Sequence, residues 1–220
     1  MKKIAQVAAL SLGIALIGCG EDTSKNAETA LRHQNSAKVY LQQGQLRAAM
    51  LEARNAIQLA PESADAYIAL ARILNDTGAY SSAITMLNNV VEQIPEVAAE
   101  LAEANIEIKK YRTALDVMQS HPAPADNAAL QYQQAYLTVK ANIALGEKDA
   151  YTEALTLFSA LPNSALDAKY LEANILLAQG QTEPAIVILN EIVAQDEKHL
   201  DALVLLGNLS LYENKLPAAE

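Results

Sequence analysis

The chain has 220 residues, a formal net charge of −10, and a hydrophobic fraction of 51% with an aromatic fraction of only 5%. Such an acidic chain is not attracted to nucleic acid phosphates or to anionic lipid headgroups, so charge-driven binding to either is excluded. There is no tryptophan and a single phenylalanine, Phe158. The core must therefore be built mainly from Ala, Leu, Ile and Tyr, which favours closely packed helices.

The first eighteen residues have the order of a secretory leader. Two lysines precede an apolar stretch over residues 4–17, which is shorter than the roughly 20 residues of a membrane-spanning helix. The stretch ends in Leu-Ile-Gly-Cys, which resembles the lipobox of bacterial lipoproteins. The resemblance implies a cleaved signal peptide at 1–18, acyl chains such as palmitate on Cys19, and a polar tether over 19–29. No disulfide can form within the chain, because Cys19 is its only cysteine.

The residue after the cysteine carries information about sorting. In the lipoproteins that this motif resembles, an aspartate at that position retains the protein on the inner membrane, whereas this chain has Gly20. The resemblance therefore implies a lipid-anchored protein on the periplasmic face of the bacterial outer membrane.

Beyond the leader, small residues and prolines recur at an interval of 34 residues or a multiple of it. One slot holds the glycines Gly44, Gly78, Gly146 and Gly180. Two further slots hold small residues, Ala37, Ala71, Ala173 and Gly207 in one, and Ala49, Ala83, Ala185 and Ala219 in the other. Pro61 and Pro95 have the same spacing. Four slots in one phase indicate an internal structural repeat.

This interval, the turn glycine, the small slots and the closing proline resemble the tetratricopeptide repeat family. The resemblance implies an all-α fold, a right-handed α-solenoid of antiparallel helix pairs that share a continuous core. Two regular repeats are predicted over 30–97, two irregular ones over 98–165, and two over 166–220. The third repeat lacks a glycine at the expected position 112, and its Tyr111 and Ala114 come about three residues early. The last repeat is incomplete, so we expect further repeats beyond Glu220.

In tetratricopeptide arrays the first helix of each pair lines a concave groove that holds peptides or helices. The repeat phase places six candidate groove residues here, Lys38, Arg72, Asn75, Tyr170, Asn174 and Asn208. An ordinary solvated surface is the alternative interpretation. The lysine-and-asparagine clamp by which some relatives bind a C-terminal carboxylate is not reproduced, because Gln34 and Ala69 occupy its positions.

No catalytic or metal site is predicted. The sequence has no glycine-rich phosphate loop, serine elbow or paired-carboxylate motif. His199 lies near Glu197 and Asp201, which could join it as metal ligands, but a solvated loop between repeats is the favoured interpretation because no further ligand spacing is present. We therefore expect a protein that is not an enzyme and that needs no cofactor other than the lipid on Cys19.

The leading hypothesis is a membrane-anchored scaffold that binds other envelope proteins, whose identity the sequence does not give. By resemblance, it could serve the assembly of a secretion or exopolysaccharide export complex. One alternative is a carbohydrate- or peptidoglycan-binding module, in which Tyr132 and Tyr136 stack on sugar rings rather than pack in the core. Another is the accessory region of an enzyme whose catalytic domain lies beyond residue 220.

Overall fold

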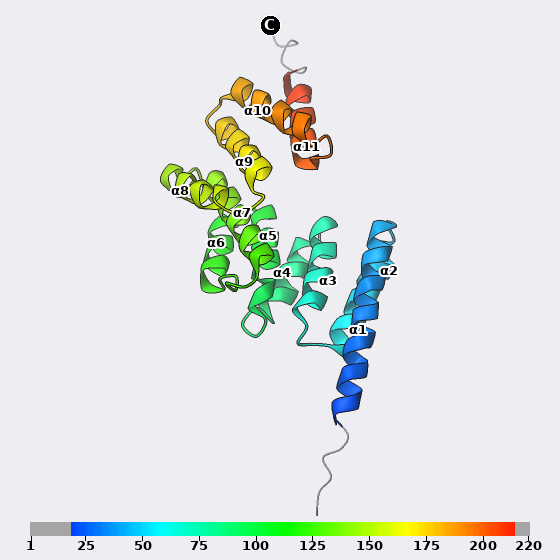
Figure 1. Ribbon diagram of the computed structural model, residues 1–220. Helices are drawn as coiled ribbons and strands as arrows, with labels where there is room; N and C mark the ends of the chain where they lie inside the picture. Colours follow the sequence, from blue (N-terminus) through cyan, green and yellow to red (C-terminus); the bar gives the residue numbers. More distant parts are fainter. Residues whose placement is uncertain (1–18, 214–220) are drawn as a thin grey trace, which may run out of the picture. The chain divides into compact units, whose positions relative to one another are not determined.

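The computed structural model describes residues 19–213, and all the regular structure in this range is helical (Figure 1). The predicted leader at 1–18 lies outside the described residues, as does the end of the chain at 214–220. The chain divides into two compact units, unit 1 (Met1–Pro61) and unit 2 (Glu62–Glu220). No helix of the described part combines the length and hydrophobicity that crossing a bilayer requires.

Unit 1 contains one helix pair, α1 (Cys19–Gln42) and α2 (Leu46–Leu59). Helix α1 runs through residues 19–29, the stretch assigned from the sequence to a tether, so this stretch is helical. Ala37 and Ala49 are both fully buried, which lets the two backbones approach closely. His33 Nδ1 lies 2.5 Å from Glu52 Oε2 and adds a polar link between the two helices.

Unit 2 is a succession of helix pairs. Its elements are α3 (Ala64–Asp76), α4 (Tyr80–Asn88), the 3₁₀ helix η1 (Pro95–Val97), α5 (Ala98–Glu107), α6 (Tyr111–Ser120), α7 (Ala128–Leu145), α8 (Lys148–Ser159), α9 (Ala165–Ala178), α10 (Thr182–Gln195) and α11 (Leu200–Glu213). Each helix packs against the next, and the first helices of consecutive pairs also pack on one another from α3 through α5 and α7 to α9. This arrangement confirms the predicted all-α solenoid.

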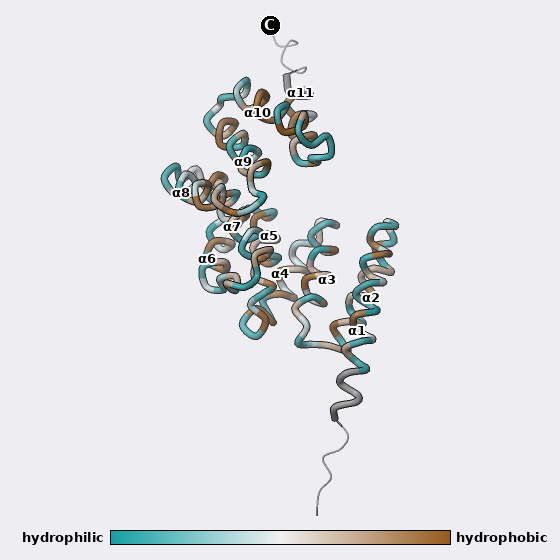
Figure 2. Tube along the Cα trace, viewed as in Figure 1, coloured by the Kyte–Doolittle hydropathy of each residue, from teal (hydrophilic) through white to brown (hydrophobic). Residues whose placement is uncertain are grey.

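The small-residue slots lie where the helices of a pair meet. Ala71, Ala83, Ala173 and Ala185 are 0% exposed, whereas Gly207 is exposed on α11. Because a larger side chain would push the paired helices apart, the four buried positions admit only small residues. Figure 2 shows hydrophobic residues recurring along the helices between hydrophilic ones, the pattern of helices that bury one face.

The two prolines of the repeat have different local roles. Pro61 directly follows Ala60, the C-cap of α2, where it prevents the helix from continuing. Pro95 instead opens η1, and α4 has already ended at Asn88. The second repeat therefore closes with turns and a 3₁₀ segment rather than with a long second helix.

The turn between the two helices of a pair uses a left-handed residue. Gly44, Gly78, Gly146 and Gly180 have φ between 71° and 76°, a region that glycine enters without steric cost. The third repeat uses Lys109 for the same purpose, with φ 63°. Its turn is closed by N–H groups bonded to carbonyls of the preceding turn, as at Gly78. The third repeat thus keeps the turn geometry without the glycine, three residues before position 112.

We expect Lys109→Gly to raise the free energy of unfolding by about 1 kcal/mol. A non-glycine residue in the left-handed region costs roughly 1–2 kcal/mol, and the added flexibility of glycine in the unfolded chain offsets part of this gain. Urea denaturation followed by circular dichroism measures the change. The matched control is Lys110→Gly, where φ is −90° and the substitution should destabilise. A Lys109→Gly variant no more stable than the parent would contradict the assignment of strain to this turn.

Candidate functional site

A row of polar side chains lies along the first helices of unit 2. Each occupies the position six residues before the left-handed turn residue of its pair, or 34 residues after its predecessor in the case of α11. We call this row the polar ladder; its members are Arg72 on α3, Glu103 on α5, Lys140 on α7, Asn174 on α9 and Asn208 on α11. Lys38 has the same position in unit 1 and is exposed.

Two members of the polar ladder, Glu103 and Lys140, were absent from the residues predicted from the sequence. Lys140 could have been found by counting back from Gly146, as Arg72 is found from Gly78. Glu103 could be found only once Lys109 was known to form the turn. The sequence therefore contains the spacing that identifies Lys140, whereas Glu103 can be identified only from the structure.

At the α3 end, the polar ladder is anchored by a buried carboxylate. Arg72 Nε donates to Glu100 Oε1 at 2.8 Å, and Gln133 Nε2 donates to the same oxygen at 3.1 Å. The Glu100 side chain is 1% exposed, whereas that of Arg72 is 57% exposed. A buried carboxylate of this kind needs its partners, because an uncompensated charge in the interior is costly. One carboxylate thus ties together three consecutive first helices, α3, α5 and α7.

Asn75, which was predicted to face the groove, is buried instead, with 8% of its surface exposed. Its Nδ2 donates to the main-chain oxygen of Glu100 at 3.3 Å. The residue therefore links α3 to α5, and it is not on the surface that a partner could reach. Its place in the sequence, three residues after Arg72, turns it toward the next first helix.

The middle of the polar ladder carries a carboxyl group with an altered pKa. The pKa of Glu103 is raised to about 7, first by burial and then by the nearby carboxylates of Glu100 and Glu107, against the opposing effect of Lys140 and Arg72. Lys140 Nζ also lies 3.0 Å from Glu107 Oε1, so α5 and α7 are joined by an ion pair at the surface. Charges of both signs are therefore concentrated on these three helices.

Glu103 is expected to make stability depend on pH. Its folded-state pKa of about 7 lies above the ordinary value of 4.5, so the folded protein binds more protons than the unfolded chain between these values. The favourable contribution of Glu103 to the free energy of unfolding is complete below pH 4.5 and is lost as the pH rises through about 7. We expect Glu103→Gln to be about 1–2 kcal/mol more stable than the parent at about pH 8, with a smaller difference at about pH 4.

Urea midpoints measured at both pH values test this expectation. The matched control is Glu153→Gln, which removes the same charge from an exposed position on α8 and should show no comparable pH-dependent gain. If Glu103→Gln is equally or less stable than the parent at the higher pH, the carboxyl group of Glu103 is not strained by its surroundings.

At the α11 end, Asp167 connects three helices. One of its carboxylate oxygens accepts a hydrogen bond from the Tyr132 hydroxyl, and the other lies 3.3 Å from His199 Nε2. His199 Nδ1 accepts a bond from the main-chain N–H of Ala202 and so caps the start of α11. Because Nδ1 accepts a hydrogen bond, Nε2 carries the ring N–H and donates a hydrogen bond to Asp167. His199 is thus used in structural hydrogen bonds, and the described residues contain no group of three His, Cys, Asp or Glu side chains that could hold a metal ion.

The tyrosines of α7 are partly buried and pack against the core. The rings of Tyr132 and Tyr136 meet the ring of Phe158 edge-on, with centroid distances of 5.0 and 5.8 Å. Phe158 itself is 0% exposed and packs with Val139 and Leu171. These contacts agree with the core-packing interpretation of the two tyrosines, because rings held edge-on against a buried phenylalanine have limited surface left to stack on a sugar.

The two remaining candidates lie together on α9. Asn174 Nδ2 donates to the main-chain oxygen of Tyr170 at 2.8 Å, and both side chains are half-buried. The Tyr170 ring lies 5.8 Å from the His199 ring. This end of the polar ladder therefore presents amides and an aromatic ring, in contrast to the charges on α3, α5 and α7.

Comparison with known proteins agrees with this geometry. The tetratricopeptide repeat family model matches residues 40–100. Among solved structures, the tetratricopeptide repeat protein TTC0263 of Thermus thermophilus is similar with a TM-score of 0.62 and 20% identity, covering 86% of this chain and 99% of that one. The fold is that of a tetratricopeptide repeat solenoid.

Two further structures of this fold are similar to the chain. MamA from Desulfovibrio magneticus has a TM-score of 0.56 and 16% identity, covering 78% of this chain and 97% of that one. YrrB, described as a tetratricopeptide repeat protein with an unusual peptide-binding site, has a TM-score of 0.50 and 16% identity, covering 84% and 95%. No curated protein matches the chain. Tetratricopeptide repeats generally mediate interactions between proteins, and at these identities the likeness concerns the fold.

Proposed function

We propose that this chain is a non-enzymatic scaffold of the bacterial envelope, anchored to the membrane by lipid on Cys19, that binds partner proteins along the polar ladder. The observation that carries the proposal is the placement of a polar side chain at one position on five consecutive first helices. A repeating surface of this kind suits an extended segment, because each helix adds a contact of similar geometry.

The polar ladder is held in place before any partner arrives. Arg72 is fixed by the buried Glu100, and Lys140 by Glu107. Side chains that are already ordered lose less conformational entropy on binding, so more of the interaction energy appears as affinity. The charges favour a segment with both acidic and basic residues at the α3–α7 end, and the amides of Asn174 and Asn208 suit main-chain groups.

A photocrosslinking experiment in living cells tests the groove. A photoreactive amino acid at Asn174, on the polar ladder, is compared with one at Val187, which is exposed on the second helix α10. We expect a discrete protein adduct from position 174, reduced by the additional substitution Lys140→Glu, and none from position 187. Adducts from position 187 alone would place the partner on the other side of the solenoid.

The lipid anchor is proposed from the motif that ends in Cys19, whose position opens α1. An acidic chain is not drawn to anionic membranes by charge, so acyl chains would have to supply the attachment. We expect radiolabelled palmitate to enter the parent chain but not Cys19→Ser, and the parent to fractionate with outer membranes. Equal labelling of both chains, or of neither, would refute the anchor. The narrower role, in assembling a secretion or exopolysaccharide export complex, predicts that the captured partner belongs to such a complex.

A further inference from the structure

The ionisable groups around the middle of the polar ladder do not balance in charge. Helix α5 carries three carboxyl groups at helical spacing on one face, those of Glu100, Glu103 and Glu107. The neighbouring first helices contribute two cations to the same cluster, Arg72 from α3 and Lys140 from α7. With all of these groups ionised, the cluster has one negative charge in excess.

Glu103 is the carboxyl group that is left without a cation. Arg72 Nε lies 2.8 Å from Glu100 Oε1, and Lys140 Nζ lies 3.0 Å from Glu107 Oε1. Within residues 19–213, the half-buried side chain of Glu103 makes no hydrogen bond or ion pair. Each of the two neighbouring cations is therefore already paired with another carboxylate.

Two buried oxygens in the same cluster also lack donors. Glu100 Oε2 and Asn75 Oδ1 accept no hydrogen bond from any described residue, although the two residues are only 1% and 8% exposed. Asn75 Nδ2 donates to the main-chain oxygen of Glu100, so both residues belong to the contact between α3 and α5. Buried acceptors without donors are costly. The cluster thus lacks both N–H donors and positive charge, and Glu103 is its half-buried member, which a ligand can reach.

We propose that the Glu103 carboxylate binds an arginine side chain of the partner segment that lies along the polar ladder. The guanidinium group would bring the cluster to three cations and three carboxylates. Arginine suits a half-buried carboxylate better than lysine does, because its planar fork can pair with both carboxylate oxygens and is more weakly hydrated. This inference rests on the proposed function, since it names the side chain that the partner presents to α5.

Binding at Glu103 is coupled to a proton. The pKa of this group is raised to about 7, first by burial, so a large fraction of the free protein carries it neutral near neutral pH. A bound guanidinium favours the ionised carboxylate, and the proton is released to solvent. We therefore expect the affinity for an arginine ligand to fall about ten-fold between about pH 8 and about pH 6.

The probes are acetyl-Ala-Ala-Arg-Ala-Ala-amide and the same peptide with citrulline, which replaces the guanidinium by an uncharged urea group of similar shape. They are titrated into the full chain, isotope-labelled at the glutamate carboxyl carbons, and followed by NMR. The Glu103 signal is assigned by its loss in Glu103→Gln. We expect the saturating arginine peptide to lower the pKa of Glu103, and the citrulline peptide to bind at least about ten-fold more weakly at about pH 8.

Glu103→Gln is also the decisive variant, and its expected gain in stability at about pH 8 means that weaker binding would not reflect unfolding. We expect it to bind the arginine peptide at least about ten-fold more weakly than the parent at this pH, with no remaining pH dependence. Glu153→Gln, which removes an exposed carboxylate from α8, should bind like the parent. A pH dependence that persists in Glu103→Gln would come from another group and would contradict the proposal.

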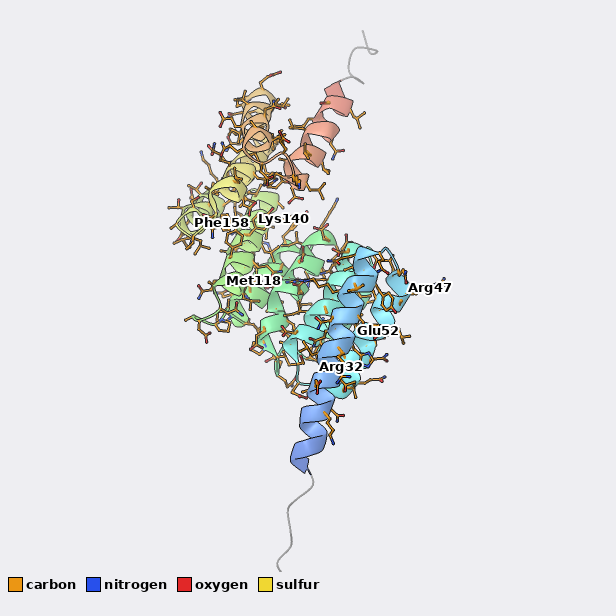
Figure 3. All side chains as sticks on the ribbon, turned by 45° about the vertical axis from the view of Figure 1, so that its right-hand side comes forward. Arg32, Arg47, Glu52, Met118, Lys140 and Phe158 are labelled. Carbon is orange, nitrogen blue, oxygen red and sulfur yellow. The ribbon has the colours of Figure 1, made fainter. Side chains whose placement is uncertain are left out.

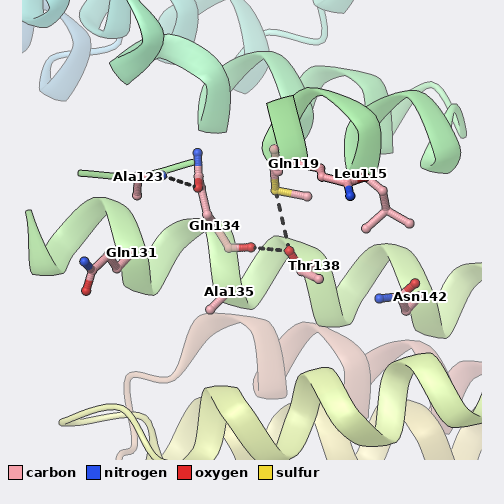
Figure 4. Close-up of a pocket in the computed structure, with 9 residues that line it drawn as sticks. Leu115, Gln119, Ala123, Gln131, Gln134, Ala135, Thr138 and Asn142 are labelled. Atoms are coloured by element: carbon pink, nitrogen blue, oxygen red, sulfur yellow. Dashed lines mark hydrogen bonds between the residues drawn. The ribbon is translucent and has the colours of Figure 1, made fainter. Parts of the chain in front are cut away.

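The α6–α7 pocket provides an internal reference (Figure 4). Its volume is about 490 Å³, and none of the residues that line it is charged. Lys140 lies about half a turn around α7 from the lining residues Thr138 and Asn142, so α7 separates the pocket from the polar ladder. We expect the signal of the Met118 methyl group, which lines the pocket, to stay unchanged when the arginine peptide saturates Glu103. Saturable shifts at Met118 with none at Glu103 would place the peptide in the pocket and overturn the proposal.

The proposal would also be overturned by equal affinity for the two peptides, by unchanged affinity in Glu103→Gln, or by the absence of saturable binding. Crosslinking from position 174 separates these results from the proposed function. If Glu103→Gln forms the same adduct as the parent, the polar ladder binds its partner without an arginine at Glu103, and only this inference fails. If the parent itself forms no adduct there, the proposed function fails as well.

Discussion

Phe158→Ala is expected to lower the free energy of unfolding by about 3–5 kcal/mol, the usual cost of deleting a fully buried phenylalanine. Phe158 on α8 (labelled in Figure 3) is 0% exposed and meets both α7 tyrosines edge-on. It also packs with Leu171 of α9, so the loss would weaken the contact between two consecutive helix pairs. In a solenoid each repeat is stabilised mainly by its neighbours, and we therefore also expect the unfolding of this variant to be less cooperative than that of the parent.

The residue before it supplies the matched control. Leu157 is 66% exposed on the same helix, and Leu157→Ala should change the free energy of unfolding by no more than about 0.5 kcal/mol. Urea denaturation followed by circular dichroism and by tyrosine fluorescence measures both the midpoint and the cooperativity. If the two alanine variants prove equally stable, Phe158 is not the centre of this core.

Arg72→Ala is expected to cost about 2–3 kcal/mol. The substitution removes the ion pair of a carboxylate that is 1% exposed, and its remaining side-chain donor is Gln133. Breaking a buried pair costs roughly 3–5 kcal/mol, and the partial exposure of Arg72 reduces that figure. Glu100 Oε2 has no hydrogen-bond partner among the described residues, so this carboxylate has little other stabilisation.

A double substitution shows whether Arg72→Ala loses stability because the Glu100 carboxylate is left without its ion-pair partner or because the packing of the Arg72 side chain is lost. In Arg72→Leu with Glu100→Leu both charges are removed together, and we expect most of the lost stability to return, because the desolvation cost of the carboxylate disappears with it. Arg72→Lys should restore only part of the stability, since an ammonium group cannot reproduce the planar N–H geometry. If the double variant is as unstable as Arg72→Ala under urea denaturation, the packing of the Arg72 stem, and not the Glu100 charge, explains the loss.

The all-helical solenoid could be predicted because its turns and its close helix contacts each require a particular type of residue, and these residues recur at a fixed spacing. A left-handed turn favours glycine, and a close helix contact excludes anything larger than alanine, so Gly78 and Ala83 recur in phase with Gly180 and Ala185. The same reasoning fails where another residue type meets the demand. Lys109 adopts the left-handed conformation at a cost in conformational energy, and no sequence pattern indicates that a lysine does so at this position.

The candidate site was less accessible from sequence than the fold. Spacing can place a residue on a helix, but it does not state the depth to which the next helix covers it, which is why Asn75 proved to be buried. The α6–α7 pocket depends on the early end of α6 and on hydrogen bonds from Gln131 and Gln134 to a loop. Such features arise from tertiary packing, which the repeat interval does not encode.

The order of residues in the polar ladder gives the surface a direction. Arg72, Glu103 and Lys140 follow one another on α3, α5 and α7, and only amides follow on α9 and α11. An extended segment bound in the reverse direction would place its charged side chains opposite asparagines. Its uncharged part would then lie opposite the charges of Arg72, Glu103 and Lys140, which would be left without partners. A segment bound along the polar ladder as proposed would therefore be distinguished from its reverse sequence, and the surface would fix which end of the segment points away from α3.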